Sequence, residues 1–99
     1  MHIISGSRLK KYCVLYSNAE PALRKWLKAT EKTVWNNFVE TRQTFPSADL
    51  VSNLTIFDIA GNNFRLITYI DYERKKVFIR EFLTHADYDK GNWKQDDWF

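Results

Sequence analysis

The spacing of apolar residues changes near residue 54, and this change constrains the fold more than any other feature of the sequence. Before it, apolar residues recur every three or four positions, as they do along one side of a helix. After it come three short apolar segments, at residues 54–59, 64–72 and 77–83, separated by turn residues. Strands joined by such short turns form an antiparallel meander. We therefore expect an α+β domain whose helices cover one face of the sheet.

A first helix is expected after a short N-terminal strand at residues 2–4. Ser5 or Ser7 supplies a side chain of the type that caps a helix N-terminus. The apolar stripe of this helix has the spacing i, i+3, i+4, i+7 and consists of Leu9, Tyr12, Cys13 and Tyr16. Cys13 lies within the stripe, which indicates a buried thiol rather than a reactive one. A single cysteine also forms no internal disulfide.

Two further helices are expected. The second opens at Asn18 or Ala19 and carries Pro21 in its first turn, where the missing N–H is harmless. The third spans residues 33–44 and ends before Pro46, because proline disfavours the helical conformation in the residue that precedes it. The predicted buried sides are Leu23, Trp26 and Leu27 in the second helix, and Trp35, Phe38, Val39 and Arg42 in the third.

The remaining connections are polar. Residues 47–53 are expected to form a loop. Residues 60–63, AGNN, form a turn in which glycine and asparagine tolerate positive φ angles, and residues 73–76, ERKK, form a charged turn. An even number of residues in each hairpin loop would fix which strand residues lie opposite one another.

With such turns, the two faces of the meander differ in character. Asp58 would lie opposite Arg65 in the first hairpin, and Tyr69 would lie opposite Arg80 in the second. One face is nearly all apolar and consists of Phe57, Ile59, Phe64, Leu66, Ile70, Val77, Ile79 and Leu83. The other mixes two arginines with aromatic rings and consists of Ile56, Asp58, Arg65, Ile67, Tyr69, Phe78, Arg80 and Phe82. The mixed face is suited to nucleic acid, through phosphate pairing and base stacking.

The segment THADYD at residues 84–89 follows the last strand directly. Thr84 and Asp87 match an acidic variant of the capping box, which predicts a short helix. Such a helix places His85, Tyr88 and Asp89 on one side, where the first two overhang the face that bears the arginines.

Composition excludes several classes of protein. A chain of 99 residues forms one domain and is too short for a doubly wound nucleotide-binding sheet. No apolar run approaches the roughly 18 residues of a membrane span, and no signal peptide is evident, so we expect a cytoplasmic protein that does not enter the membrane. The net charge of +3 is unevenly distributed, with eight Lys and Arg against four Asp and Glu over residues 1–53. A basic first half suits a polyanionic partner such as RNA.

Three blocks of sequence carry a family resemblance. They are FPSAD at residues 45–49, FDIAGNNFRLI at residues 57–67 and IREFLTHADYDKGNW at residues 79–93. The combination of GN-x-x-R and TH-x-x-YD, in this order and spacing, is more specific than either motif alone. The chain resembles the HigB branch of the RelE-like toxins of bacterial toxin–antitoxin systems, and the resemblance covers almost the whole chain.

This resemblance implies a single RelE-like domain over residues 1–99. It also implies an endoribonuclease that cleaves mRNA, typically translated mRNA in the ribosomal A site. A cognate helix-turn-helix antitoxin would neutralise the toxin. The pair would repress its own operon, so that the toxin meets DNA only through the antitoxin.

Cleavage of RNA without a metal needs a base for the 2′-hydroxyl, a stabiliser of phosphorane charge and an acid for the 5′-oxygen. The sequence offers no metal-ligand constellation, since its only histidines are His2 and His85, and no cofactor is expected. The expected catalytic residues are Arg65 and Arg80 for phosphate charge, and His85 and Tyr88 for proton transfer. Asp89 or Glu81 would orient His85, and the expected RNA contacts are Asn62, Tyr69 and Lys94.

Each candidate also has a structural interpretation. Arg65 can pair with Asp58 across the hairpin, and Arg80 with Asp87 in the segment after the last strand. The other candidates also have purely structural interpretations. His85 would be a helix-cap residue with an exposed ring, Tyr88 would be an aromatic ring that packs on its neighbours, and Asn62 would be a turn residue. For the whole chain, the alternative is a non-catalytic RNA- or ribosome-binding module on the same fold.

Overall fold

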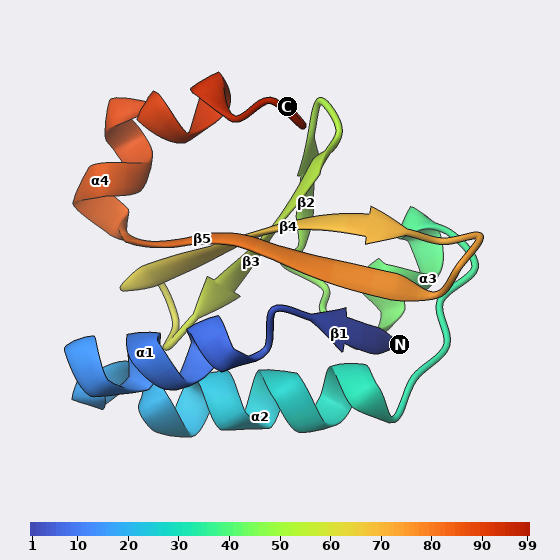
Figure 1. Cartoon of the computed structure of the whole chain (residues 1–99), viewed down its shortest axis with the longest axis horizontal. Coiled ribbons are helices and arrows are strands. Elements are labelled where there is room, and N and C mark those ends of the chain that lie inside the picture. The colour runs from blue at the N-terminus through green and yellow to red at the C-terminus, as the bar shows by residue number, and fades with distance from the viewer.

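The computed structural model describes residues 1–99 and has an α+β architecture, as the sequence predicts (Figure 1). A five-stranded sheet runs in the order β1-β5-β4-β3-β2, with β1 parallel to β5 and all other neighbours antiparallel. The strands are β1 (His2–Ile4), β2 (Asp49–Val51), β3 (Leu54–Ile59), β4 (Phe64–Asp71) and β5 (Lys76–Thr84). The predicted N-terminal strand and meander are therefore present, and β2 extends the meander where a polar loop was expected.

Helical segments cover both faces of this sheet. Figure 1 shows α1 and α2 side by side along one face, and α4 with the C-terminal segment on the other. The α-helices are α1 (Ser7–Leu15), α2 (Glu20–Glu31), α3 (Phe38–Thr44) and α4 (His85–Lys90), and the 3-10 turns are η1 (Ser17–Ala19) and η2 (Asn92–Gln95). No helix combines the length and hydrophobicity that a membrane crossing needs.

The main core lies between the sheet and the helices α1 and α2. Four aromatic rings form its centre, where Phe57 lies 5.3 Å from Trp26, 6.2 Å from Trp35 and 5.2 Å from Phe45 between ring centroids. A second, smaller cluster on the opposite face consists of Leu54, Ile56, Ile67 and Trp93. The mixed face is thus partly covered by the chain's own C-terminal segment rather than open.

The first hairpin has the predicted register, with Asp58 opposite Arg65. The second does not, because its turn occupies residues 72–75 instead of 73–76. Tyr69 therefore lies opposite Phe78, and the register shifts between Ile67 and Thr68. This irregularity leaves Arg80 without a partner in the ladder, since Thr68 pairs with Ile79 while Ile67 pairs with Glu81.

The extra residue in β5 reverses the alternation of side chains after it. Phe82 packs in the main core and Leu83 against the second cluster, the opposite of the predicted assignment. Arg8 of α1 donates from Nη1 to the carbonyl oxygens of Ile79 and Arg80, at 3.2 and 3.1 Å. Arg8 therefore supplies the hydrogen-bond donors for the part of the β5 edge that extends beyond β1.

The predicted helices differ from the observed ones mainly in α3. It begins at Phe38, and Asn37 caps it by accepting from the N–H of Glu40 at 3.0 Å. The preceding residues are not helical, so the helical phase assumed for residues 33–44 was wrong. Val39 and Arg42 are consequently exposed, and Thr41 takes the buried position.

At α1, the expected serine cap is absent: Gly6 occupies the N-cap position, and no side chain caps the helix. Cys13 is only partly buried, although it packs against the main core as its stripe predicts. In α2, Pro21 lies in the first turn and Leu23 and Trp26 are buried, which confirms the interpretation of that segment.

The aromatic centre of the core sets a stability prediction. Phe57→Ala removes a ring that three other rings contact, and we expect it to lower the free energy of unfolding by about 3–5 kcal/mol. Val39→Ala, at a side chain that is 67% exposed, is the matched control and should change it by less than about 0.5 kcal/mol. Urea unfolding followed by tryptophan fluorescence measures both, and equal effects would contradict this account of the core.

Candidate functional site

Arg65, at the start of β4, is buried, and all three nitrogens of its guanidinium contact protein groups. Nε lies 3.1 Å from Asp58 Oδ1 in an ion pair across the hairpin. Nη1 donates to the carbonyl oxygens of Asn62 and Phe64 at 3.2 and 3.0 Å. Nη2 contacts Asn62 Oδ1 and lies 3.3 Å from His85 Nδ1. The guanidinium therefore joins the β3–β4 turn to α4.

His85 is held at the first position of α4 from two sides. The Thr84 side chain caps the helix by accepting from the N–H of Asp87, as the capping box predicts, and the His85 N–H donates to the Asn63 carbonyl at 2.9 Å. Since Arg65 can only donate, we assign Nδ1 as the acceptor of its 3.3 Å contact. Nε2 then carries the proton and lies 3.2 Å from Asp89 Oδ2. Asp89 is therefore the carboxylate that contacts the ring.

Tyr88 lies one helical turn beyond His85. Its ring stacks on Trp93 with centroids 5.0 Å apart, and the Arg65 guanidinium is 5.5 Å from the ring centroid. Burial raises the pKa of the Tyr88 hydroxyl, nearby Asp49 raises it further, and Arg65 opposes this rise only in part. Tyr88 therefore keeps its proton at neutral pH and is a hydrogen-bond donor rather than a base.

A pocket of about 430 Å³ opens beside these residues. It is lined by Arg42, residues 46–49, Ile56, Asp58, Arg65 and Tyr88. Arg42 and Asp49 were not among the site residues expected from the sequence. The only signal for Asp49 was the FPSAD motif, which ends on it, and Arg42 had been assigned to the buried side of a helix. Pairing of β2 with β3 places Asp49 opposite Ile56 and so on the wall of the pocket.

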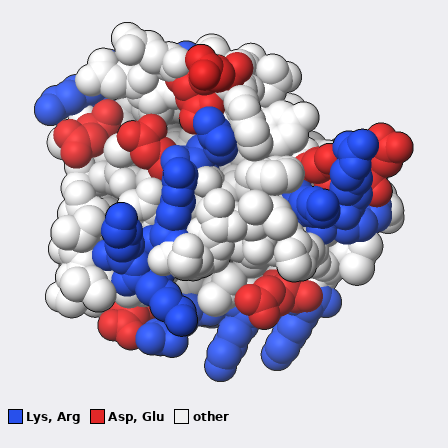
Figure 2. Space-filling model, viewed as in Figure 1, with Lys and Arg blue, Asp and Glu red and all other residues white.

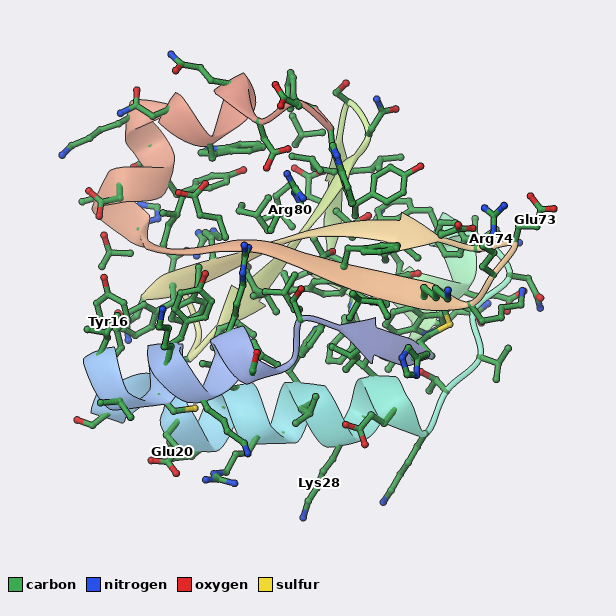
Figure 3. The ribbon with its side chains drawn as sticks, viewed as in Figure 1. Tyr16, Glu20, Lys28, Glu73, Arg74 and Arg80 are labelled. Carbon is green, nitrogen blue, oxygen red and sulfur yellow. The ribbon has the colours of Figure 1, made fainter.

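Arg80 lies apart from this cluster, although it is on the same face of the sheet. Figure 3 shows it between β5 and the C-terminal segment. Nε and Nη2 donate to the two carboxylate oxygens of Asp96 at 2.9 and 2.8 Å, and the guanidinium is 3.9 Å from the centroid of the Trp98 ring. The expected structural partner Asp87 instead contacts Lys90. Arg80 thus anchors the C-terminal segment to the sheet.

The other expected residues divide between these two locations. Asn62 belongs to the Arg65 cluster, and its φ is not positive, since Ala60 and Gly61 take that conformation in the turn. Tyr69 packs near Arg80, with its ring centroid 5.3 Å from that of Trp98. Lys94 is exposed, 5.7 Å from the Trp93 ring. The structure therefore brings together Asn62, Arg65, His85 and Tyr88, and leaves Tyr69, Arg80 and Lys94 outside.

Both signs of charge are spread over the visible face of the molecule. Figure 2 shows Lys and Arg side chains projecting along the edge where α2 lies, with acidic side chains among them, and further acidic side chains near α4 and the C-terminal segment. Glu81 has a raised pKa, caused first by burial and then by the neighbouring Asp96 charge.

No group of three or more His, Cys, Asp and Glu side chains is arranged to hold a metal ion.

Comparison of the sequence with known proteins shows the family of this chain. Residues 19–91 match the model of the HigB toxin family, described as the RelE-like toxic component of a toxin–antitoxin system. The chain belongs to the HigB toxin family. It is 32% identical over 93 residues to the mRNA interferase HigB of Escherichia coli O6:H1 strain CFT073, covering 91% of this chain and 90% of that protein. It is 28% identical over 92 residues to the mRNA interferase toxin HigB of Escherichia coli K12. That alignment covers 90% of this chain and 88% of that protein.

The region that matches the family model ends before the C-terminal segment that contacts Arg80. It includes Arg65, Arg80, His85 and Tyr88, and it stops at residue 91. The contacts that Asp96 and Trp98 make with Arg80 therefore lie beyond the matched region. The two curated relatives nonetheless align over about nine-tenths of the chain.

The buried guanidinium gives a prediction about stability. Arg65→Ala leaves Asp58 and Asn62 without their partner, and we expect a loss of about 3 kcal/mol in the free energy of unfolding. Arg24→Ala removes an ion pair whose side chains are 69% and 41% exposed, and should cost about 0.5 kcal/mol or less. Urea titrations of both variants test this. A negligible loss in Arg65→Ala would show that the hydrogen bonds around Arg65 do not support the fold.

The Arg80–Asp96 pair gives a prediction about pH. The hydrogen bonds that Arg80 donates to Asp96 hold the pKa of this carboxyl group below its usual range. The pair therefore stabilises the fold above about pH 4, and this contribution disappears as the pH falls through the pKa of the folded state. Asp96→Asn should lower the free energy of unfolding by about 1–3 kcal/mol at pH 7 and by less at pH 3.

Asp97→Asn, at the exposed neighbouring position, is the matched control and should have no resolvable effect at either pH. Chemical unfolding at the two pH values separates the variants. The same loss in Asp96→Asn at both pH values would contradict a stabilising role for the ionised carboxylate.

Proposed function

We propose that this chain is an endoribonuclease that cleaves mRNA and is the toxin of a type II toxin–antitoxin pair. Membership of the HigB family and the naming of its relatives as mRNA interferases support this. The observation that carries it is the position of His85 between the carboxylate of Asp89 and the guanidinium of Arg65, which lines an open pocket. That arrangement fixes the tautomer of a histidine that can move a proton.

In the proposed reaction, RNA is cleaved by its own 2′-hydroxyl, without a metal or cofactor. Arg65 Nη2 exchanges its contact with His85 Nδ1 for a phosphate oxygen, and Nδ1 then accepts the proton of the 2′-hydroxyl. The 2′-oxygen forms its bond to phosphorus as the bond from phosphorus to the 5′-oxygen breaks. Asp89, on Nε2, stabilises the imidazolium that results.

Tyr88 is proposed to donate its proton to the departing 5′-oxygen. Its raised pKa keeps the hydroxyl protonated until the alkoxide, which is more basic, develops. The products are a 2′,3′-cyclic phosphate and a 5′-hydroxyl, and the proton on His85 returns to Tyr88 through solvent. Arg80 keeps Nη1 free of protein partners and so has two donors for a phosphate nearby.

The proposed partners follow from the same assignment. The substrate is translated mRNA in the ribosomal A site, and a cognate helix-turn-helix antitoxin neutralises the toxin in the cytoplasm. Asn62, Tyr69 and Lys94 are proposed to contact RNA. The excess of Lys and Arg over residues 1–53 provides an electrostatic attraction to ribosomal RNA that falls with salt. Residues 1–99 act as one domain in this proposal.

One observation favours the alternative, a non-catalytic RNA- or ribosome-binding module on the same fold. All three guanidinium nitrogens of Arg65 contact groups within the protein, and Arg80 donates to both carboxylate oxygens of Asp96. A module that only binds RNA would need neither side chain to be released. It predicts salt-dependent binding that leaves the RNA intact.

Primer extension on a translated mRNA separates the two functions. The wild-type protein should produce new 5′ ends, and His85→Ala should reduce the cleavage rate about 100-fold or more because it removes the proposed base. His2→Ala, at the only other histidine and on an exposed edge of β1, is the matched control and should cleave like the wild type.

Growth on induction gives an independent measurement. Expression of the wild-type chain should arrest growth, and His85→Ala should relieve the arrest. Intact mRNA in the presence of bound wild-type protein would support the binding module instead. Full toxicity of the Arg65/Arg80/His85 triple alanine variant would refute the assignment of the catalytic residues.

A further inference from the structure

The pocket that Arg65 and Tyr88 line has a wall that the proposed reaction does not use. This wall is the FPSAD segment, residues 45–49, of which residues 46–49 line the pocket together with Arg42. The C-terminal end of α3 supplies Arg42, and β2 supplies Asp49. The reacting groups stand on the other side, where Arg65 and Tyr88 are part of the lining.

The charges of the pocket are not all neutralised within the protein. Asp58 and Arg65 pair with each other at 3.1 Å, so neither presents an uncompensated charge. Arg42 has no carboxylate partner, and its Nε and Nη2 donate only to the Pro46 carbonyl, at 3.4 and 3.2 Å. The carboxylate of Asp49 takes part in none of the ion pairs and in none of the side-chain hydrogen bonds of the structure. One cation and one anion therefore remain for a ligand.

A ligand that matches both charges carries an anionic group and N–H donors. A nucleotide unit does so, with its phosphate for Arg42 and the edge of its base for Asp49. A pocket of about 430 Å³ lies in the size range of small-molecule sites. A site for phosphate alone would gain nothing from Asp49, whose charge would repel the anion.

The carboxylate of Asp49 also selects among bases. It is an acceptor only, so it pairs with the exocyclic amino groups of adenine, cytosine and guanine. Uracil has no amino group, and its single N–H is flanked by two carbonyl oxygens that a carboxylate repels. The chemistry of the pocket thus favours an amino-bearing base over uracil.

We propose that this pocket binds one nucleotide of the RNA next to the cleavage point, with Arg42 on its phosphate and Asp49 reading an amino-bearing base. The inference rests on the proposed function in one respect, that the ligand is RNA. It assigns to Arg42 and Asp49 a role in substrate selection and none in the chemical step. The FPSAD segment is then the wall of a specificity site.

Binding to oligonucleotides that lack the 2′-hydroxyl tests the site separately from cleavage. The probes are 2′-deoxy hexamers of adenosine, cytidine or uridine, titrated by fluorescence anisotropy. We expect the wild-type protein to bind the adenosine and cytidine hexamers about 5-fold or more tightly than the uridine hexamer. Asp49→Asn, which can donate to uracil, should abolish that preference.

Arg42→Gln should weaken the binding of all three hexamers by a similar factor. It should also reduce the slope of log K against log salt by about 0.7, as expected for one lost phosphate contact to a single strand. Asp71→Asn and Arg74→Gln are the matched controls, because these residues pair with each other at 3.1 Å near the opposite turn of the sheet. Both controls should bind like the wild type.

The outcomes distinguish this proposal from the function on which it rests. Equal wild-type affinity for the three hexamers, or an unchanged preference in Asp49→Asn, would overturn the specificity site even if the protein cleaves mRNA. An unchanged salt slope in Arg42→Gln would overturn the phosphate contact. The expected preference in a protein that leaves mRNA intact would uphold the site and refute the nuclease.

Discussion

The rest of the candidate site depends on the burial of one guanidinium, that of Arg65. A buried charge is tolerated only when its donors are satisfied, and here an ion pair, a turn carbonyl, a strand carbonyl, an amide oxygen and an imidazole nitrogen satisfy them. These partners come from β3, from β4 itself, from the β3–β4 turn and from α4. Arg65 therefore links α4 to the sheet, together with the Asn63 carbonyl that accepts from the His85 N–H and the stacking of Tyr88 on Trp93.

The C-terminal segment imposes a second constraint, because it covers part of the sheet face opposite α1 and α2. Trp93 is buried in the second cluster, and Asp96 and Trp98 hold Arg80 between them. The sheet is therefore not an open platform for stacked bases. The pocket lined by residues of α3, β2, β3, β4 and α4 remains open beside this segment, and its Arg42 and Asp49 take part in no ion pair.

The parts of the site that the sequence predicted are those that local geometry determines. The cap on Thr84, the contact between His85 and Asp89, and the pairing of Asp58 with Arg65 all follow from spacings of a few residues. The face that bears Arg80 was predicted, but its cross-strand register was not, because that register depends on a turn that begins one residue earlier and on an extra residue in β5. The sequence gives no local signal for that residue: Phe82 and Leu83 are both apolar, so either can face the core.

The same reasoning applies to the pocket. The phase of α3 was predicted from apolar spacing, whereas the Asn37 cap starts the helix late and turns Arg42 outward. Asp49 became a pocket residue because a short polar segment pairs with β3, and only contact between distant segments can specify such pairing.

By itself, the sequence determined the α+β class, the first hairpin and the short helix that carries His85 and Tyr88, since each rests on periodicity or on a motif a few residues long. Only the tertiary structure decided which arginine joins the histidine, which one anchors the C-terminal segment, and which charges are left for a ligand. Those outcomes depend on the burial and pairing of groups far apart in the chain, and the free energy of such pairing has no counterpart in local spacing.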